Sequence, residues 1–137
     1  SGYVFYLLNI HYEHKATGQP ARLEASRQIL NFVANKTQDV IIMGDFNARI
    51  TTDELELLTD GDKFINTYTL FNRITSTDTT VHSFDGPRAK NKAVIDHILV
   101  NKNLKDKVVS SVIIKDALPS GRYPSDHYGV MAVVKLS

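Results

Sequence analysis

Residues 41–50, IIMGDFNARI, place an acid and an amide directly after a continuous apolar run. The run at 39–43, DVIIM, is short and bounded by turn-forming residues, which favours a strand covered on both faces. A glycine follows, and then Asp45 and Asn47 come two residues apart. In an extended segment this spacing points both side chains to one side and leaves Phe46 to pack inside. Asp and Asn also favour turns, so simple turn chemistry is an alternative interpretation.

Strand-like and helix-like segments alternate on both sides of this stretch. Residues 3–10, YVFYLLNI, have the composition and length of a buried strand. Residues 21–36 carry apolar side chains at helical spacing and predict an amphipathic helix. Residues 52–59 predict a short helix, introduced by the capping-box pattern Thr51-x-x-Glu54. We expect further strands at 81–84, 93–100, 108–115 and 128–136, the last three mainly antiparallel, and leave 63–80 unassigned. This order indicates an α/β layer with a mixed sheet.

Composition excludes several classes of protein. A chain of 137 residues with 42% hydrophobic content fits one domain with a buried core. A net charge of +1 argues against a broad basic nucleic-acid surface or a polybasic membrane anchor, but a local phosphate site stays compatible with it. The absence of cysteine excludes disulfides and thiolate chemistry. No apolar run approaches about 18 residues, so no membrane span is expected. Nothing indicates a cellular location, and Ser1-Gly2 resembles a cloning remnant.

Polar residues capable of chemistry gather at the ends of the expected strands. In α/β sheets ligand sites form beyond strand ends, so separate segments can deliver such residues to one rim. The residues are His11 after the first strand, Asp45 and Asn47 after the second, Asp96 within AVIDHILV, and Asp126 and His127 before the last. An ionised Asp inside an apolar run needs a partner.

This set of side chains has a coherent chemistry. Carboxylates with an amide make a hard oxygen site suited to Mg²⁺ or Mn²⁺. Histidines can hydrogen-bond a phosphoryl oxygen, and an Asp beside a His fixes its tautomer. Together they suggest metal-assisted attack of water on a phosphate ester.

Each residue also has a structural interpretation. Asp96 has Arg88, Lys90 and Lys92 as potential structural partners, and His11 alone reads as a surface loop residue. Residues 125–127, SDH, have the composition of a capping turn before a strand. The functional interpretation rests on the coincidence of all four segments.

Three blocks occur in order and carry a family resemblance: GDFNA at 44–48, IDHILV at 95–100 and YPSDHYGVMAVV at 123–134. They resemble the last motif blocks of the endonuclease/exonuclease/phosphatase superfamily, the DNase I-like proteins. LLNIHYEHKATGQPARLEASRQIL at 7–30 is similar to the family's Asn-Thr-His-Leu strand, loop and helix, with Ile10 and Tyr12 as departures around His11. TVHSFDG at 80–86 resembles the small block that precedes the Ile-Asp strand.

The resemblance implies a divalent-metal-dependent phosphoesterase or phosphodiesterase and a role for each residue. Asp45 would orient or deprotonate the attacking water, and Asn47 would hydrogen-bond the phosphoryl oxygens. His127 would contact the scissile phosphate, with Asp96 orienting it. The remaining roles are a phosphate contact for His11 and a metal ligand for Asp126. The substrate class stays open between nucleic acid, phospholipid and sugar phosphate. Inositol phosphatases are disfavoured because their Trp-Thr-Asp-Arg block is replaced by VIDH at 94–97.

Family members are about twice this length, and their first half supplies an Asn and a metal-binding Glu. Residues 1–137 match only the C-terminal half: half of a DNase I-like α/β sandwich, with one mixed β-sheet and helices on one face. The expectations are an inactive fragment and a homodimer formed through the sheet face that the other half normally covers. The alternative is a non-catalytic phosphate-binding remnant or module that lacks the metal-binding Glu.

Overall fold

The computed structural model describes residues 2–136, so the expectation for Ser1 lies outside the described residues. Two α-helices, α1 Gln19–Val33 and α2 Asp53–Thr59, occur in this range. The strands are β1 Phe5–His11, β2 Asp39–Asp45, β3 Phe64–Asn66, β4 Asp96–Asn101, β5 Val108–Ile114 and β6 Gly129–Val134. Short 3₁₀ turns occupy Ala16–Gly18, Asp60–Asp62, Tyr68–Leu70, Gly86–Arg88 and Lys102–Lys107. No helix within residues 2–136 is long and apolar enough to cross a membrane.

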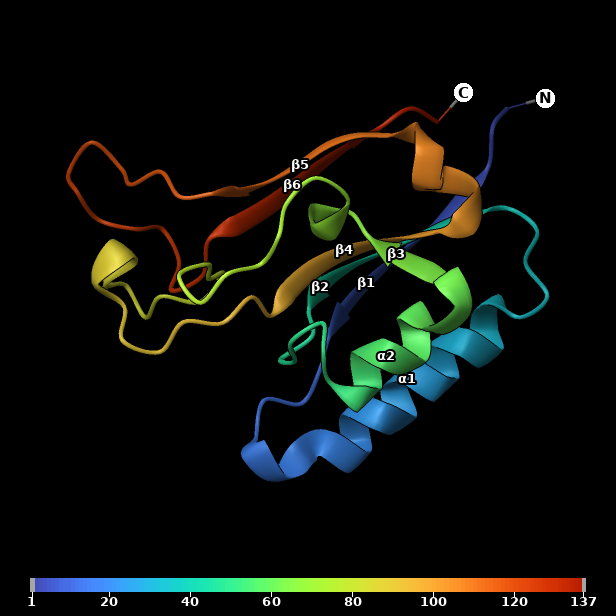
Figure 1. Ribbon diagram of the computed structural model, residues 1–137, viewed down its shortest axis with the longest axis horizontal. Coiled ribbons are helices and arrows are strands. Elements are labelled where there is room, and N and C mark those ends of the chain that lie inside the picture. The colour runs from blue at the N-terminus through green and yellow to red at the C-terminus, as the bar shows by residue number, and fades with distance from the viewer. Residues whose placement is uncertain (1, 137) are drawn as a thin grey trace.

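Four strands form a mixed sheet in the order β1-β2-β4-β3, which confirms the predicted α/β class. β1 and β2 are parallel, and β4 is antiparallel to both β2 and β3. Figure 1 shows α1 and α2 together on one side of this sheet. The sheet side chains that face the helices form the main core with them: Tyr6, Leu8, Val40, Ile42, Phe64 and Leu99 pack with Ile29, Leu55 and Leu58.

The remaining strands, β5 and β6, form a separate antiparallel hairpin, whereas the sequence placed all strands in one sheet. β4 pairs with β2 on one side and with β3 on the other, so it has no free edge with which β6 could pair. The hairpin instead contacts the sheet through side chains, with Val108 and Val134 in a second core cluster around Val100. Figure 1 shows the hairpin on the opposite side of the sheet from the helices.

The segment 81–84 is not a strand, which corrects the prediction. It forms one isolated bridge, Val81 to His127, and then turns. Ser83 and Phe84 have φ values of 50° and 65°, a left-handed conformation that cannot continue a ladder. The unassigned region 63–80 contains β3, and α1 begins at Gln19, with Pro20 in its first turn.

The predicted capping box at the start of α2 is also wrong, because Glu54 has another partner. No side chain caps α2. Glu54 lies buried and its Oε1 accepts a hydrogen bond from Arg22 Nε at 2.7 Å. Burial raises the pKa of Glu54, but the hydrogen bond and charge of Arg22 outweigh it and leave this pKa below its ordinary value. Arg22 Nη1 also donates to the carbonyls of Glu13 and Lys15, so one guanidinium joins α1, α2 and the loop after β1.

Candidate active site

Three of the predicted site residues occupy one row across the sheet. The register pairs His11 with Asp45 between β1 and β2, and Asp45 with Asp96 between β2 and β4. Because directly paired residues share a face, all three side chains lie on the face away from the helices. His11 Nε2 lies 3.7 Å from Asp45 Oδ2. The parallel strands β1 and β2 end, and the antiparallel strand β4 begins, at this same end of the sheet.

Gly44 allows β1 and β2 to approach at this edge. Its φ is 141°, and a Cβ at this position would lie 1.9 Å from the Ile10 carbonyl oxygen. Only glycine fits without moving the β1 backbone. The glycine that ends the apolar run is therefore required for placing Asp45 beside His11.

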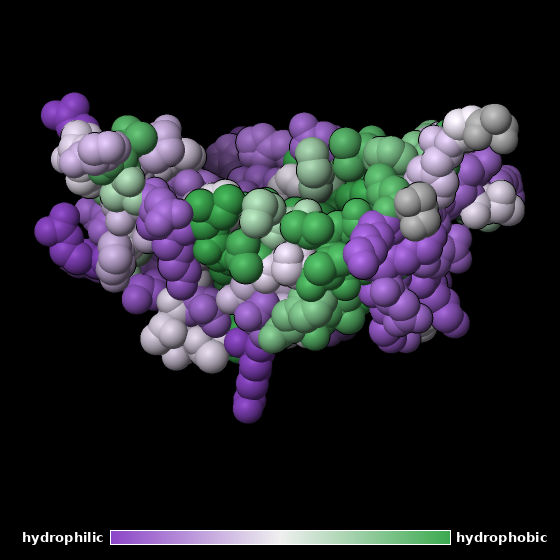
Figure 2. Space-filling model, turned by 90° about the horizontal axis from the view of Figure 1, so that it is seen from above, coloured by the Kyte–Doolittle hydropathy of each residue, from purple (hydrophilic) through white to green (hydrophobic). Residues whose placement is uncertain are grey.

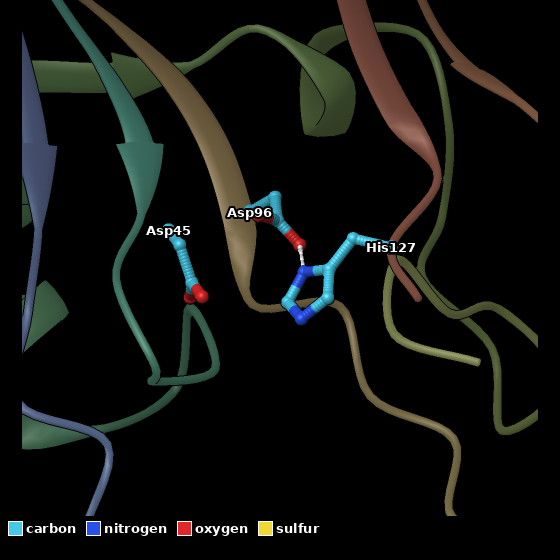
Figure 3. Close-up of side chains that lie close together, drawn as sticks. All are labelled: Asp45, Asp96 and His127. Atoms are coloured by element: carbon cyan, nitrogen blue, oxygen red, sulfur yellow. Dashed lines mark hydrogen bonds and ion pairs between the residues drawn. The ribbon is translucent and has the colours of Figure 1, made fainter. Parts of the chain in front are cut away.

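His127 and Asp96 form a close pair from segments far apart in the sequence. His127 Nδ1 donates to Asp96 Oδ2 at 2.7 Å, as Figure 3 shows. This bond leaves Nε2 of the ring for the open side of the site. Among the described residues, His127 is the one ion-pair partner of Asp96. The alternative partners Arg88, Lys90 and Lys92 form no ion pair with it. Burial raises the pKa of Asp96 above its ordinary value, hydrogen bonds with Thr80 and His127 oppose this, and the charge of Asp45 adds to it.

Thr80 positions both members of this pair and has no role in the sequence-based prediction. It is fully buried, and its Oγ1 accepts hydrogen bonds from the backbone N–H groups of Ile95 and Asp96. Its carbonyl accepts from Tyr128 N at 2.7 Å. One residue thus ties the start of β4 to the segment that carries His127. The TVHSFDG block that begins with Thr80 was the available signal.

Asn47 reaches the site by a turn rather than by an extended strand. β2 ends at Asp45, and Asn47 has a φ of 46°. Its backbone N–H donates to Asp45 Oδ1 at 2.8 Å, and its Nδ2 donates to the Tyr12 carbonyl at 2.9 Å. Phe46 is fully buried, as predicted. The prediction that Asn47 continues an extended strand was therefore wrong. Asn47 lies in a turn, and this turn still places it beside Asp45.

His97 anchors the loop that carries Asn47, and no pattern in the sequence singles it out as a residue of the site. It is 2% exposed, its Nε2 donates to the Ala48 carbonyl, and its Nδ1 accepts from Asn66 Nδ2. Burial lowers its pKa to about 4, so it is neutral at pH 7. The alternation along β4 was the available signal, because Asp96 on the site face requires His97 on the core face.

All six predicted site residues line one open cavity of about 510 Å³. The cavity is lined by His11, His14, Asp45, Asn47, Asp96, Ser125, Asp126 and His127. Asp126 is exposed, with Ser125 Oγ at 3.5 Å from its Oδ1, and it lies at the rim rather than at the centre. His14, which had no claim from its spacing, joins the lining.

The site offers part of the donor set that a divalent cation needs. Asp45, Asp96 and His127 each bring one ligand atom within 4.8 Å of the others. His127 Nδ1 and Asp96 Oδ2 are already bonded to each other, so the available carboxylates are those of Asp45 and, at the rim, Asp126. Mg²⁺ is commonly held by one or two carboxylates together with waters and substrate phosphates. The donor set therefore suits a hard cation that takes its other ligands from outside this chain.

The family model described as Endonuclease/Exonuclease/phosphatase family matches residues 1–127. The chain belongs to the endonuclease/exonuclease/phosphatase family. A search of curated protein sequences finds no match.

Solved structures show the same fold at low sequence identity. A family protein from Bacteroides vulgatus aligns over 100% of this chain and 51% of its own, with a TM-score of 0.76 and 24% identity. The mannosyl-6-phosphatase Bt3783 of Bacteroides thetaiotaomicron aligns over 93% and 50%, with a TM-score of 0.70 and 24% identity. D. rerio TDP2, complexed with a single-strand DNA product, aligns over 90% and 53%, with a TM-score of 0.69 and 18% identity. The chain spans about half the length of these structures.

Proposed function

We propose that this chain is the C-terminal half of a divalent-metal-dependent phosphoesterase domain. The observation that carries the proposal is the Asp96–His127 pair, which lies beside Asp45 in an open polar cavity. Family membership supports hydrolysis as the reaction class.

The side chains divide the reaction among them. The Asp45 carboxylate takes a proton from the attacking water, whose oxygen forms the new P–O bond. The leaving oxygen departs with the electron pair of the broken P–O bond. The second Nδ2 hydrogen of Asn47 donates to a phosphoryl oxygen, where charge accumulates in the transition state, and the imidazolium form of His127 donates to another from Nε2. Asp96 orients the His127 ring by accepting from Nδ1, and exposed His11 adds a contact at the rim.

Mg²⁺ or Mn²⁺ is the proposed cofactor, held from this chain by Asp126, which leaves the Asp45 carboxylate free to act as the base. When bound, the ion supplies electrostatic stabilisation of the phosphoryl oxygens. The resemblance to the family implies that a Glu from the other half of the domain completes the ligand set. We therefore propose that this chain alone hydrolyses phosphate esters poorly or not at all.

The proposed substrate is a phosphate ester recognised through its phosphate. Related folds include a mannosyl-6-phosphatase and TDP2 in complex with single-strand DNA, so sugar phosphates and nucleic acids are both candidates. A net charge of +1 favours a few local phosphate contacts over a long basic surface.

We also propose that the chain forms a homodimer through its exposed apolar surface. Figure 2, viewed from the hairpin side, shows hydrophobic residues gathered in the middle of the face. Large exposed apolar side chains are Phe5 and Leu7 on β1, Val109, Val112 and Ile114 on β5, and Met131 and Val133 on β6. β1 is also an edge strand with an unpaired ladder side.

The test separates phosphate recognition from turnover. With Mg²⁺ or Mn²⁺ present, we expect the chain alone to show no metal-dependent hydrolysis of bis(4-nitrophenyl) phosphate. NMR titration with inorganic phosphate should still shift the His127 ring and Asn47 side-chain signals. The Asn47→Gly variant accepts the positive φ and should weaken this binding by roughly three- to tenfold, the loss of one or two hydrogen bonds.

Two results would contradict the proposal. Turnover comparable to that of a complete family domain would refute the claim that the chain is half of a site. Phosphate binding that leaves the His127 and Asn47 signals unchanged would refute the assigned site. Phosphate binding that persists without any turnover, even when the chain is mixed with the N-terminal half of a related family domain, would favour the non-catalytic binding module instead.

A further inference from the structure

A second cavity, of about 630 Å³, lies at the end of the sheet away from the candidate active site. β2 passes this cavity at Val40 and ends at Asp45, while β4 begins at Asp96 and ends beside the cavity at Asn101. Strands rise about 3.3 Å per residue, so five residues separate the two cavities by roughly 17 Å. A ligand in the second cavity would therefore not touch the catalytic residues.

The walls of this cavity are apolar and come from separate elements. Leu30 and Val33 belong to the last turns of α1, Val40 is the second residue of β2, and Phe64 opens β3. Val40 and Phe64 are 2% and 3% exposed and belong to the main core, so this part of the wall is fixed by packing. Its volume falls in the range of sites that hold small molecules.

The rim of the cavity is cationic. Lys36, Lys63 and Lys102 line it, and no acidic residue does. The Lys36 ammonium lies 5.2 Å and 4.9 Å from the ring centroids of Tyr6 and Phe32, so its charge is directed to these rings and its aliphatic carbons line the cavity. Lys63 makes a long, exposed contact of 3.9 Å with Asp60, of the kind that contributes little. Lys63 and Lys102 therefore supply the positive charge.

Asn101 closes one side of the cavity at the end of β4. Its Nδ2 donates to the Gln38 carbonyl at 3.1 Å, which fixes the orientation of the amide. Its Oδ1 is buried beneath the surface, so the cavity offers a ligand no acceptor from this side chain.

We propose that this cavity binds a small amphipathic anion. Its apolar body would lie against Leu30 and Val33, which are partly exposed in the cavity, and its acidic group would face Lys63 and Lys102. The apolar wall selects the body of the ligand, and the cationic rim without acids selects its charge.

The probe is 8-anilinonaphthalene-1-sulfonate, which combines an apolar ring system with an anion. We expect it to shift the NMR signals of Leu30, Val33 and the Asn101 side-chain amide in the full chain. The Lys63→Ala/Lys102→Ala variant should bind it roughly five- to tenfold more weakly at low salt, and the difference should shrink as salt is added. N-phenyl-1-naphthylamine, which lacks the sulfonate, should bind the cavity more weakly than the anion.

The matched control is Lys90→Ala/Lys115→Ala, which removes the same net charge from lysines that do not line the cavity. It should bind the probe like the unmodified chain. Equal weakening in both double variants would overturn the proposal, as would equal binding of the neutral analogue. Signal shifts confined to the exposed apolar residues around Leu7 and Met131, with none at Leu30, Val33 or Asn101, would also overturn it.

Discussion

Asp96 and His127 hold each other in one arrangement, and that arrangement determines what the imidazole can do. The bond from Nδ1 to Asp96 leaves Nε2 for the cavity. Thr80 fixes the backbone on both sides of this bond, and Asn47 takes its place through a left-handed turn stabilised by Asp45. At the scale of single residues, the site is therefore built by local turns and by one buried hydroxyl.

Asp96→Asn should change the tautomer of His127. An Asn oxygen accepts the Nδ1–H bond less strongly than a carboxylate, and its amide favours the opposite tautomer. We expect ¹⁵N NMR of the His127 ring to show Nδ1 protonated in the unmodified chain and a larger fraction protonated at Nε2 in the variant. Unchanged ring nitrogen shifts would show that Asp96 does not position His127, and Asp116→Asn is the control because residue 116 lies outside the cavity.

The helices act on the site through one buried ion pair. Arg22 and Glu54 are 10% and 1% exposed, and Arg22 also holds the carbonyls of the loop after β1. That loop leads away from His11, and the layer of α1 and α2 covers the sheet face behind the site (Figure 1). At the scale of elements, one buried pair joins the two helices to each other and to the loop that follows His11.

Arg22→Ala should lower the free energy of unfolding by about 3–5 kcal/mol, because it leaves the Glu54 carboxylate buried and unpaired. Urea denaturation followed by circular dichroism measures this change. The Arg22→Met/Glu54→Met variant removes both charges and should be much closer to the unmodified chain. Equal destabilisation by the two variants would show that lost packing, not the unpaired charge, is the cause.

The whole molecule combines a well-packed helix-facing core with an apolar surface on its other side. The helix-facing cluster contains fully buried Ile42, Leu55 and Leu58, whereas Leu7 on β1 is 52% exposed. An exposed apolar surface beside an edge strand favours association with another sheet. The helix-facing side of the sheet therefore stabilises the fold, and the opposite side offers the surface for association.

Acidification should destabilise the fold through His97. Its folded pKa is lowered to about 4 while the unfolded value is near 6.5, so only the unfolded state gains a proton between these values. Its stabilising effect is complete above pH 6.5 and falls by roughly 1.4 kcal/mol per pH unit down to about pH 4. Denaturation across this range should show that slope, and His97→Gln should remove it.

Asp96 acts in the opposite sense, because a raised carboxyl pKa makes the folded state bind its proton first and gain stability on acidification. The difference between the unmodified chain and His97→Gln isolates the histidine. A pH dependence that is the same in both chains would contradict the assignment.

Leu7→Lys should convert the proposed dimer to a monomer, because it places a charge in the apolar surface at little cost to the monomer's own core. Sedimentation velocity measures the change. Gln28→Lys, on the exposed side of α1, adds the same charge and should leave the dimer intact. An unmodified chain that stays monomeric at high concentration would contradict the proposed homodimer.

Local pattern was sufficient to predict most elements. Apolar runs of strand length predicted β1, β2, β4, β5 and β6, and apolar residues at helical spacing predicted α1, because burial of strands and of one helix face produces these patterns. The helix α2 was placed by a capping-box pattern whose Glu54 pairs with Arg22 instead. The left-handed backbone at Ser83 and Phe84 was not predictable, since it depends on contacts with Asp126 rather than on their own preferences. The same holds for Glu54, whose partner is 32 residues away.

The sequence by itself determined the family, the alternation of helices and strands, and the residue types at the strand ends. Only the tertiary structure decided which of these residues meet. The register placed His11, Asp45 and Asp96 in one row, and packing brought His127 to Asp96 across 31 residues. It also buried His97 and divided the strands between a sheet and a hairpin. Spacing along a chain fixes which face a side chain occupies, but its neighbours depend on contacts between distant segments, which local preferences do not encode.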